Sequence, residues 1–196
     1  MNKSFISTYF CNKSGDELKR TITPNWDEVT LKNHLNLIKV PKDINSAIEV
    51  GCGCGRLMKN IIEDKGCFMV GIDASQEMID EGKKYLKDYS ELFKLVKVDG
   101  EGKMKDIGHG FDFAYSIITF QHIPNTETVL TYIKNMYKSL RDGGELMFQV
   151  LKQDFNKGEL WSYHDLDVLE KQLVELGAKD INIHHANKWA IFRCKK

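Results

Sequence analysis

The stretch EVGCGCGR, residues 49–56, places glycines at positions 51, 53 and 55, directly after the apolar run SAIEV. Glycine adopts left-handed backbone conformations easily and lets a ligand approach the backbone where a side chain would block it. Alternate glycines at the end of a strand therefore indicate a sharp turn that enters a helix and lies close to a bound molecule. The alternative is an ordinary strand-to-helix turn, but such a turn does not require three glycines.

Two specific ligands, a zinc ion and NAD, fit this loop poorly. A zinc site is disfavoured because a single residue separates Cys52 from Cys54, whereas zinc ligands are spaced by roughly two to four residues. We therefore expect no metal. The loop of NAD-dependent oxidoreductases reads G-x-G-x-x-G, and here Arg56 stands where the last glycine of that pattern would be. An NAD(P)-binding oxidoreductase remains an alternative function.

A carboxylate follows the loop at the spacing that is typical of nucleoside binding. Asp73 ends the second apolar run, VGID, about 20 residues after the glycines. There its two oxygens can accept hydrogen bonds from both hydroxyls of a ribose. Aspartate is also a favoured helix N-cap, so capping the helical stretch SQEMIDEG is the alternative role for Asp73.

Short apolar runs alternate with helical stretches throughout the chain after residue 45. This alternation predicts parallel strands joined by helical crossovers. The last two runs, INIHHA and KWAIFRC, are separated by so short a turn that they can pair only as an antiparallel hairpin. We expect an α/β fold with a doubly wound, seven-stranded sheet that is mostly parallel and has an antiparallel hairpin strand at its C-terminal end.

Helix boundaries can also be predicted. Leu31, Leu35 and Ile38 share one face of a leading helix that starts near Trp26. The glycines of RDGG, residues 141–144, are expected to end the helix that begins near Thr126. A later helix is expected to open with a capping box formed by Ser162 and Asp165, and to close at Gly177.

The composition limits the class of protein. Lysine plus arginine and aspartate plus glutamate number 28 each, so no basic field attracts nucleic acid, and a nucleic-acid partner is disfavoured. The 196 residues suit a single domain, 1–196, in which residues 1–45 form a helical cap. Five scattered cysteines and a polar start predict a cytoplasmic protein. No apolar run reaches the roughly 18 residues of a membrane span, so we expect no membrane partner.

The motifs together resemble the class I S-adenosylmethionine-dependent methyltransferases, whose first motif is an acid, any residue and then G-x-G-x-G. VGIDASQEMI is similar to the second motif of that family, KVDGEG to the third, and FDFAYSIITFQHIPN to the fourth with its following loop. The resemblance covers most of the chain and implies a Rossmann-like fold. It implies a cofactor-binding set of Glu49, Gly51, Cys52, Gly53, Asp73, Ala74, Met78, Asp99, Gly100, Ser116 and Ile117.

The resemblance also implies roles for members of this set. Asp73 would hold the ribose, and Met78 would lie against the adenine. Asp99 would accept a hydrogen bond from the adenine amino group, while the backbone N–H of Gly100 bonds the ring. Asp142 departs from the family, in which proline often precedes the paired glycines, but this affects only the turn.

The function that the resemblance implies is methyl transfer from S-adenosyl-L-methionine to a small-molecule acceptor, with S-adenosyl-L-homocysteine as product. In-line methyl transfer depends on positioning and exclusion of water more than on a protein nucleophile. His122 in QHIPN is the candidate general base, and shaping the loop or holding the methionine part of the cofactor is its alternative role. A non-catalytic module that only holds the cofactor is a further alternative. The oligomeric state stays open.

The acceptor is expected to bind at the least patterned segments. These are Met1 to Pro24, with Tyr9 and Phe10, and the loop KQDFNKGELWSYH. The alternative is that the aromatic residues of both segments pack at the edge of the core. The loop contributes Phe155, Trp161 and Tyr163.

Overall fold

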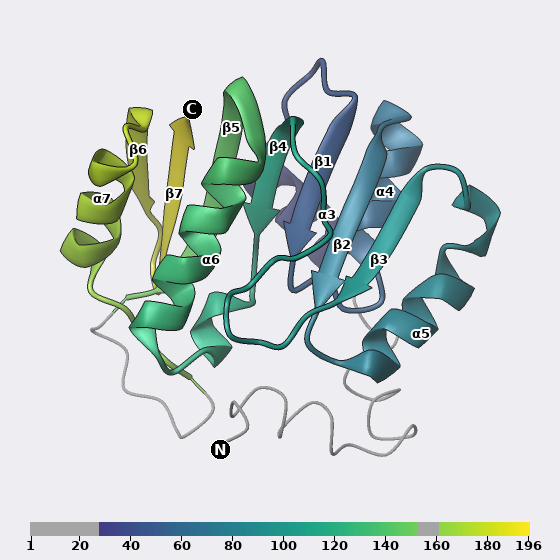
Figure 1. Cartoon of the computed structure of the whole chain (residues 1–196), viewed down its shortest axis with the longest axis horizontal. Coiled ribbons are helices and arrows are strands. Elements are labelled where there is room, and N and C mark those ends of the chain that lie inside the picture. The colour runs from purple at the N-terminus through teal and green to yellow at the C-terminus, as the bar shows by residue number, and fades with distance from the viewer. Residues whose placement is uncertain (1–27, 153–160) are drawn as a thin grey trace.

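The computed structural model describes residues 28–152 and 161–196, and within them the chain forms a seven-stranded sheet. The strands are β1 (Ser46–Val50), β2 (Phe68–Asp73), β3 (Phe93–Lys97), β4 (Phe111–Ser116), β5 (Leu140–Leu151), β6 (Lys179–His185) and β7 (Trp189–Lys195). They lie in the order β3-β2-β1-β4-β5-β7-β6 (Figure 1). Neighbouring pairs from β3 to β5 are parallel, whereas β7 runs antiparallel to both β5 and β6. The predicted fold class is therefore confirmed.

Helices cover both faces of this sheet. In Figure 1, α6 (Thr126–Ser139) and α7 (Leu166–Glu175) lie in front of it, and α3 (Glu28–Ile38) and α4 (Arg56–Lys65) lie behind it. α5 (Gln76–Tyr85) packs beside β3. Two short 3₁₀ helices, η1 (Lys87–Tyr89) and η2 (Phe120–His122), follow α5 and β4. Because side chains alternate along a strand, Ile48 and Val50 of β1 join the core with α6, whereas Ala47 joins the core with α4.

The predicted leading helix is present as α3, which is described from Glu28 onward. Its residues Leu31, Leu35 and Ile38 pack against the core on the α4 side of the sheet, as the sequence predicts. At its C-terminal end, the Arg193 guanidinium of β7 donates to the Ile38 carbonyl. This contact satisfies a carbonyl that the helix itself leaves without a partner and places a cation at the negative end of the helix dipole.

The helix after β4 ends earlier than the sequence predicts. α6 ends at Ser139, and RDGG, residues 141–144, lies within β5. The prediction was wrong because strand pairing starts at once, with Leu140 opposite Phe111. Gly143 has a left-handed φ of 74°, as a helix-ending glycine would. It lies, however, in the first part of β5, where the register against β4 is irregular.

The last helix also opens differently. The N-cap of α7 is Asp165, whose side chain accepts a hydrogen bond from the Asp167 backbone N–H at 2.9 Å. The prediction that Ser162 caps this helix is therefore wrong. Ser162 donates its backbone N–H to the Gln121 carbonyl at 2.6 Å, so this tertiary contact holds it outside the helix. Gly177 follows the helix with a left-handed φ of 79°, as predicted.

Candidate functional site

The glycine loop follows β1 and leads directly into α4. Gly51, Gly53 and Gly55 have φ angles of 77°, 54° and 81°, so all three are left-handed. The backbone N–H groups of Gly51 and Cys52 donate to the Ile72 carbonyl at 2.8 and 3.0 Å, which ties the loop to the end of β2. The sharp turn that the alternate glycines predict is confirmed.

The three glycines differ in what surrounds them. A Cβ atom at Gly51 would lie 2.1 Å from Thr119 Oγ1, and one at Gly55 would lie 2.7 Å from Leu86 Cδ1. A Cβ at Gly53 would meet no atom of the described chain within 4 Å. The Thr119 side chain therefore leaves no room for a Cβ at Gly51, whereas at Gly55 the end of the Leu86 side chain is in the way. No described residue fills the space beside Gly53, so a ligand can approach bare backbone there.

Asp73 connects the end of β2 to this loop. Its Oδ2 accepts a hydrogen bond from the Gly53 backbone N–H at 2.8 Å, and its Oδ1 accepts one from the Ser75 backbone N–H at 2.8 Å. Burial raises the pKa of Asp73, and hydrogen bonds from the backbone N–H groups of Ser75, Gly53 and Ala74 lower it. An ionised carboxylate has about four acceptor sites, so about one remains for a further donor. The N-cap of α5 is Ser75, whose side chain accepts from Met78, and not Asp73.

Glu49 is buried beside the loop, with 3% of its surface exposed. The Tyr115 hydroxyl on neighbouring β4 donates to Glu49 Oε2 at 2.9 Å. Burial raises the pKa of Glu49 to about 8, although the hydrogen bond from Tyr115 opposes this rise. The charge of Asp73 raises the Glu49 pKa further. A carboxyl group beside the loop therefore changes its charge near neutral pH, as titratable groups in binding sites often do.

Replacing Glu49 by glutamine is expected to change how stability depends on pH. The pKa of Glu49 is 4.5 when unperturbed and about 8 in the folded state, so wild type loses stability as pH rises between these values. Glutamine keeps an oxygen that accepts from Tyr115 but carries no charge. The difference in free energy of unfolding, Glu49→Gln minus wild type, should therefore grow as pH rises between these two pKa values. It should grow by at most about 1.4 kcal/mol per pH unit.

Urea unfolding of both proteins at about pH 5, 7 and 9 measures this difference. Glu170→Gln, at an exposed position on α7, is the matched control and should follow the wild-type profile. A difference between Glu49→Gln and wild type that is the same at every pH would contradict the raised pKa.

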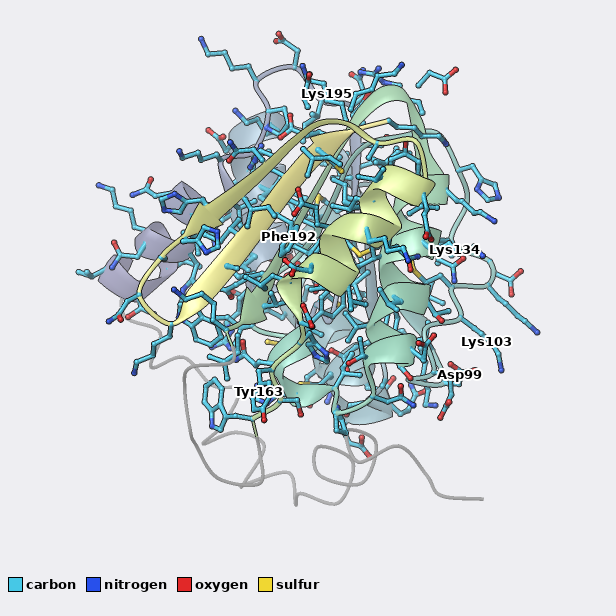
Figure 2. All side chains as sticks on the ribbon, turned by 90° about the vertical axis from the view of Figure 1, so that its left-hand side faces the viewer. Asp99, Lys103, Lys134, Tyr163, Phe192 and Lys195 are labelled. Atoms are coloured by element: carbon cyan, nitrogen blue, oxygen red, sulfur yellow. The ribbon has the colours of Figure 1, made fainter. Side chains whose placement is uncertain are left out.

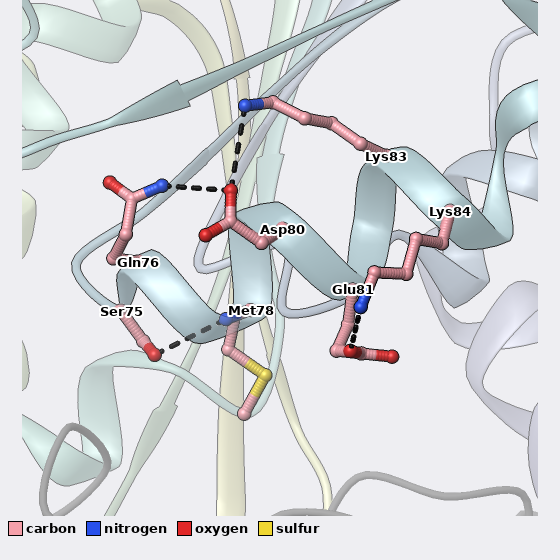
Figure 3. Close-up of polar contacts among 7 residues, drawn as sticks. All are labelled: Ser75, Gln76, Met78, Asp80, Glu81, Lys83 and Lys84. Atoms are coloured by element: carbon pink, nitrogen blue, oxygen red, sulfur yellow. Dashed lines mark hydrogen bonds and ion pairs between the residues drawn. The ribbon is translucent and has the colours of Figure 1, made fainter. Parts of the chain in front are cut away.

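Ala74 and Met78 follow β2 in the chain. Ala74 is half-buried, and Met78 is buried in the first turn of α5. The Met78 side chain points away from the ion pair between Asp80 and Lys83 on the outer side of the helix (Figure 3). An apolar side chain is therefore available near the carboxyl end of β2.

Asp99 and Gly100 follow β3. Asp99 is exposed, its Oδ1 accepts from the Glu101 backbone N–H at 2.8 Å, and its Oδ2 lies 3.7 Å from Lys103 Nζ (Figure 2). Exposed ion pairs of this kind contribute little energy, so Asp99 can exchange Lys103 for another donor. Gly100 is buried and has a left-handed φ of 81°.

Ser116 and Ile117 lie where β4 ends, beside β1. Ser116 is fully buried, and its hydroxyl donates to the Val50 carbonyl at 3.0 Å. The Ile117 carbonyl accepts from the Thr119 hydroxyl at 3.1 Å, and the same hydroxyl lies 3.3 Å from the Val50 carbonyl. These contacts tie the end of β4 to the residue that precedes the glycine loop. The Ser116 hydroxyl is used internally, so a ligand would meet the backbone here.

His122 lies in η2 and is partly exposed. Its Nε2 is 3.3 Å from Gln121 Nε2, and its ring centroid is 5.4 Å from that of Trp161. Trp161 also packs against Trp189, at 5.9 Å between ring centroids. His122, Trp161 and Trp189 thus form an aromatic wall near the carboxyl end of β4, and Trp161 and Tyr163 expose 39% and 49% of their surfaces.

Two polar residues near this aromatic wall were not predicted from the sequence. Gln121 is fully buried, and its Oε1 has no hydrogen-bond partner among the described residues. His164 is buried, with Nε2 at 3.2 Å from the Phe120 carbonyl and Nδ1 at 3.1 Å from the Thr126 hydroxyl. His164 therefore pins the segment QHIPN from a position about 40 residues away, which no local pattern reveals. Tyr9, Phe10 and Phe155 lie outside the described residues.

The described ranges, 28–152 and 161–196, contain neither a metal-binding cluster nor a helix that could span a membrane. In them no group of three or more His, Cys, Asp or Glu side chains is arranged to hold a metal ion. Cys52 and Cys54 are buried, and burial raises the pKa of both thiols, which disfavours the thiolate form. In the same ranges no helix combines the length and the apolar character that crossing a membrane requires.

Comparison with known families identifies the chain. The methyltransferase-domain family matches residues 48–146, about half of the chain, and this match includes the glycine loop, Asp73, Asp99 and His122. The chain belongs to this family, the class I S-adenosylmethionine-dependent methyltransferases. The family does not favour the nicotinamide alternative that was considered for the loop.

Curated relatives of this methyltransferase share part of the chain. A ubiquinone biosynthesis O-methyltransferase of Coxiella burnetii is 27% identical over 108 residues, which cover 55% of this chain and 44% of the relative. A sterol 24-C-methyltransferase of Saccharomyces cerevisiae is 32% identical over 98 residues, which cover 50% of this chain and 25% of the relative. The chain therefore spans less than half the length of these relatives.

Solved structures share the fold over nearly the whole of this chain. The N-methyltransferase NodS of Bradyrhizobium japonicum, in complex with S-adenosyl-L-homocysteine, has a TM-score of 0.68 at 16% identity. The match covers 92% of this chain and 97% of NodS. A phosphoethanolamine N-methyltransferase of Haemonchus contortus, in complex with S-adenosyl-L-methionine, has a TM-score of 0.70 at 15% identity and covers 92% of this chain and 59% of that one. At such identities the likeness establishes the fold.

Proposed function

We propose that this methyltransferase binds S-adenosyl-L-methionine at the carboxyl ends of β1 to β4 and methylates a small molecule. The observation that carries the proposal is that no described residue fills the space beside Gly53, next to a carboxylate, Asp73, that retains an unused acceptor site. The family supports this cofactor, and so do the ligands in the NodS and phosphoethanolamine N-methyltransferase structures.

The residues at these strand ends suit the parts of such a cofactor. Asp73 would accept from the ribose hydroxyls, because a charged acceptor makes stronger hydrogen bonds than a neutral one. Ala74 and Met78 offer an apolar surface for the adenine. Asp99 would accept from the adenine amino group, with the Gly100 N–H as donor to the ring.

The remaining proposed contacts lie along β1 and β4. The Gly51, Cys52 and Gly53 backbone would lie against the cofactor, and Ser116 and Ile117 would meet it through backbone groups. Glu49 would favour a positively charged ligand in its ionised form. The bound cofactor supplies an already activated methyl group on a positively charged sulfur. The chain would then contribute orientation and exclusion of water, and needs no nucleophile of its own.

The acceptor is proposed to bind near the aromatic wall of His122, Trp161 and Trp189. Flat apolar rings with a few polar groups are typical of small-molecule sites. The names of the relatives are consistent with small acceptors, since they include a sterol and a phosphoethanolamine methyltransferase. His122 is proposed to shape this segment, because its ring is already engaged with Trp161 and Gln121. A role as general base is the alternative.

Calorimetric titration of the purified protein with S-adenosyl-L-homocysteine, and separately with NADH, tests the cofactor. We expect S-adenosyl-L-homocysteine to bind and NADH not to bind. Binding of NADH alone would refute the proposal in favour of an oxidoreductase. Transfer of labelled methyl groups from S-adenosyl-L-methionine into a metabolite extract then separates an enzyme from a module that only holds the cofactor.

The domain organisation and the cellular location are proposed from length and composition. We propose a single domain over residues 1–196, with residues 1–45 as a helical cap, of which residues 1–27 lie outside the described residues. A cytoplasmic location is consistent with the four cysteines of the described chain, which are all free thiols.

A further inference from the structure

Ile118 adopts a backbone conformation that its side chain disfavours. Its φ is 58°, in the left-handed region, and it lies two residues after the end of β4. A β-branched residue in this region is an outlier that persists only where surrounding contacts enforce it, and such residues cluster at functional sites. Among the four left-handed residues other than glycine in the described chain, Ile118 alone is β-branched.

A buried glutamine is hydrogen-bonded to this strained residue. The Ile118 backbone N–H donates to Gln149 Oε1 at 3.1 Å. Gln149 lies on β5, directly beside β4, and is 3% exposed. This hydrogen bond is partly buried, and removing its acceptor leaves the Ile118 N–H without this partner. The Gln149 side chain therefore provides a tertiary hydrogen bond that can offset the strain at Ile118.

The strained turn is in contact with the glycine loop. Thr119, the next residue, bonds through its hydroxyl to the carbonyls of Ile117 and Val50. Its side chain fills the space that a Cβ at Gly51 would occupy. The position of Thr119 thus limits the position of the loop, and the conformation of Ile118 sets where Thr119 lies.

We infer that Gln149 is a positioning residue for the cofactor: by holding Ile118 left-handed, it keeps Thr119 seated against Gly51 and the glycine loop in its binding geometry. Gln149 acts through Ile118 and Thr119 and need not touch the cofactor itself. The inference rests on the proposed placement of the cofactor against the glycine loop.

The test compares two substitutions of Gln149 by calorimetric titration with S-adenosyl-L-homocysteine. Gln149→Met has a similar length but lacks the acceptor oxygen, and it is expected to bind about tenfold more weakly than wild type. Gln149→Glu retains an acceptor oxygen and is expected to bind within about threefold of wild type. Circular dichroism at the titration temperature confirms that both variants are folded. Wild-type affinity in folded Gln149→Met would overturn the inference.

A rescue experiment separates positioning from a merely structural role. Glycine adopts the left-handed conformation without help, so Ile118→Gly should no longer need Gln149. The double variant Ile118→Gly/Gln149→Met is expected to bind S-adenosyl-L-homocysteine within about threefold of Ile118→Gly alone. If Gln149→Met weakens binding tenfold in both backgrounds, Gln149 does not act through Ile118 and the inference fails.

Two outcomes of these titrations need separate treatment: wild type that does not bind S-adenosyl-L-homocysteine, and a Gln149→Met variant that does not fold. If wild type itself does not bind S-adenosyl-L-homocysteine, the proposed function fails, which is a different outcome from unchanged binding in the variant. If Gln149→Met does not fold, hydrogen exchange of the Ile118 amide in wild type takes its place. We expect this amide to be protected to the same degree as those of β4, and exchange at the rate of an open loop would rule out the Gln149 contact.

Discussion

Gly51→Ala is expected to lower the free energy of unfolding by about 2 to 5 kcal/mol. The added Cβ would lie 2.1 Å from Thr119 Oγ1 and 2.3 Å from Thr119 Cγ2, so the loop or the β4 turn has to shift. The φ of 77° adds the cost of a left-handed alanine. Urea unfolding at neutral pH measures the loss.

Gly53→Ala is the matched control within the same loop. Its φ of 54° is also left-handed, but its Cβ would meet no atom of the described chain within 4 Å. We expect a smaller loss of stability, about 1 to 2 kcal/mol. Because the Cβ enters the space proposed for the cofactor, the affinity for S-adenosyl-L-homocysteine should fall about tenfold or more. Wild-type affinity in Gly53→Ala would show that the ligand lies elsewhere.

A double-mutant cycle identifies the source of the Gly51 effect. In a Thr119→Gly background the overlapping side chain is absent, so Gly51→Ala should cost only the left-handed term, about 1 to 2 kcal/mol. The same cost in both backgrounds would mean that Thr119 is not the obstacle.

Asp73→Ala is expected to weaken binding of S-adenosyl-L-homocysteine by about 1.5 to 3 kcal/mol, the range for hydrogen bonds to a charged group. This corresponds to a loss of affinity of roughly tenfold to more than a hundredfold. Two effects contribute, because Asp73 is the proposed ribose ligand and also accepts the Gly53 N–H that orients the loop. Calorimetric titration of the folded variant provides the measurement.

Asp80→Ala is the control for this prediction. Asp80 lies on the following helix, is exposed, and contacts Gln76 and Lys83 on the surface. Its removal should leave the affinity within about twofold of wild type, since exposed pairs of this kind contribute little. Equal affinities of Asp73→Ala, Asp80→Ala and wild type would refute the ribose role of Asp73.

Much of the fold could be predicted because its determinants are local. Apolar runs of strand length alternate with helix-length segments, and the short turn before Trp189 permits only an antiparallel hairpin. The same holds for the glycine loop, in which all three glycines are left-handed as expected. The roles assigned to the cofactor-binding residues stay predictions.

The two boundary errors have a common cause. Glycines in RDGG and the pair Ser162 and Asp165 match local signals for a helix end and a helix start. In the structure, pairing of Leu140 with β4 and the hydrogen bond from Ser162 to Gln121 override those signals. Both overriding contacts join segments far apart in the chain, where a local pattern carries no information.

The amino-acid sequence alone determined the α/β class, the order of strands and helices along the chain, the left-handed loop and the carboxylate at the end of β2, because each depends on residues close together in the sequence. Tertiary structure alone decided that Glu49 is buried and accepts a hydrogen bond from Tyr115, and that the N–H of the strained residue Ile118 donates to Gln149. These pairs are 66 and 31 residues apart, and their energies arise from burial and hydrogen-bond geometry that exist only once neighbouring strands have paired.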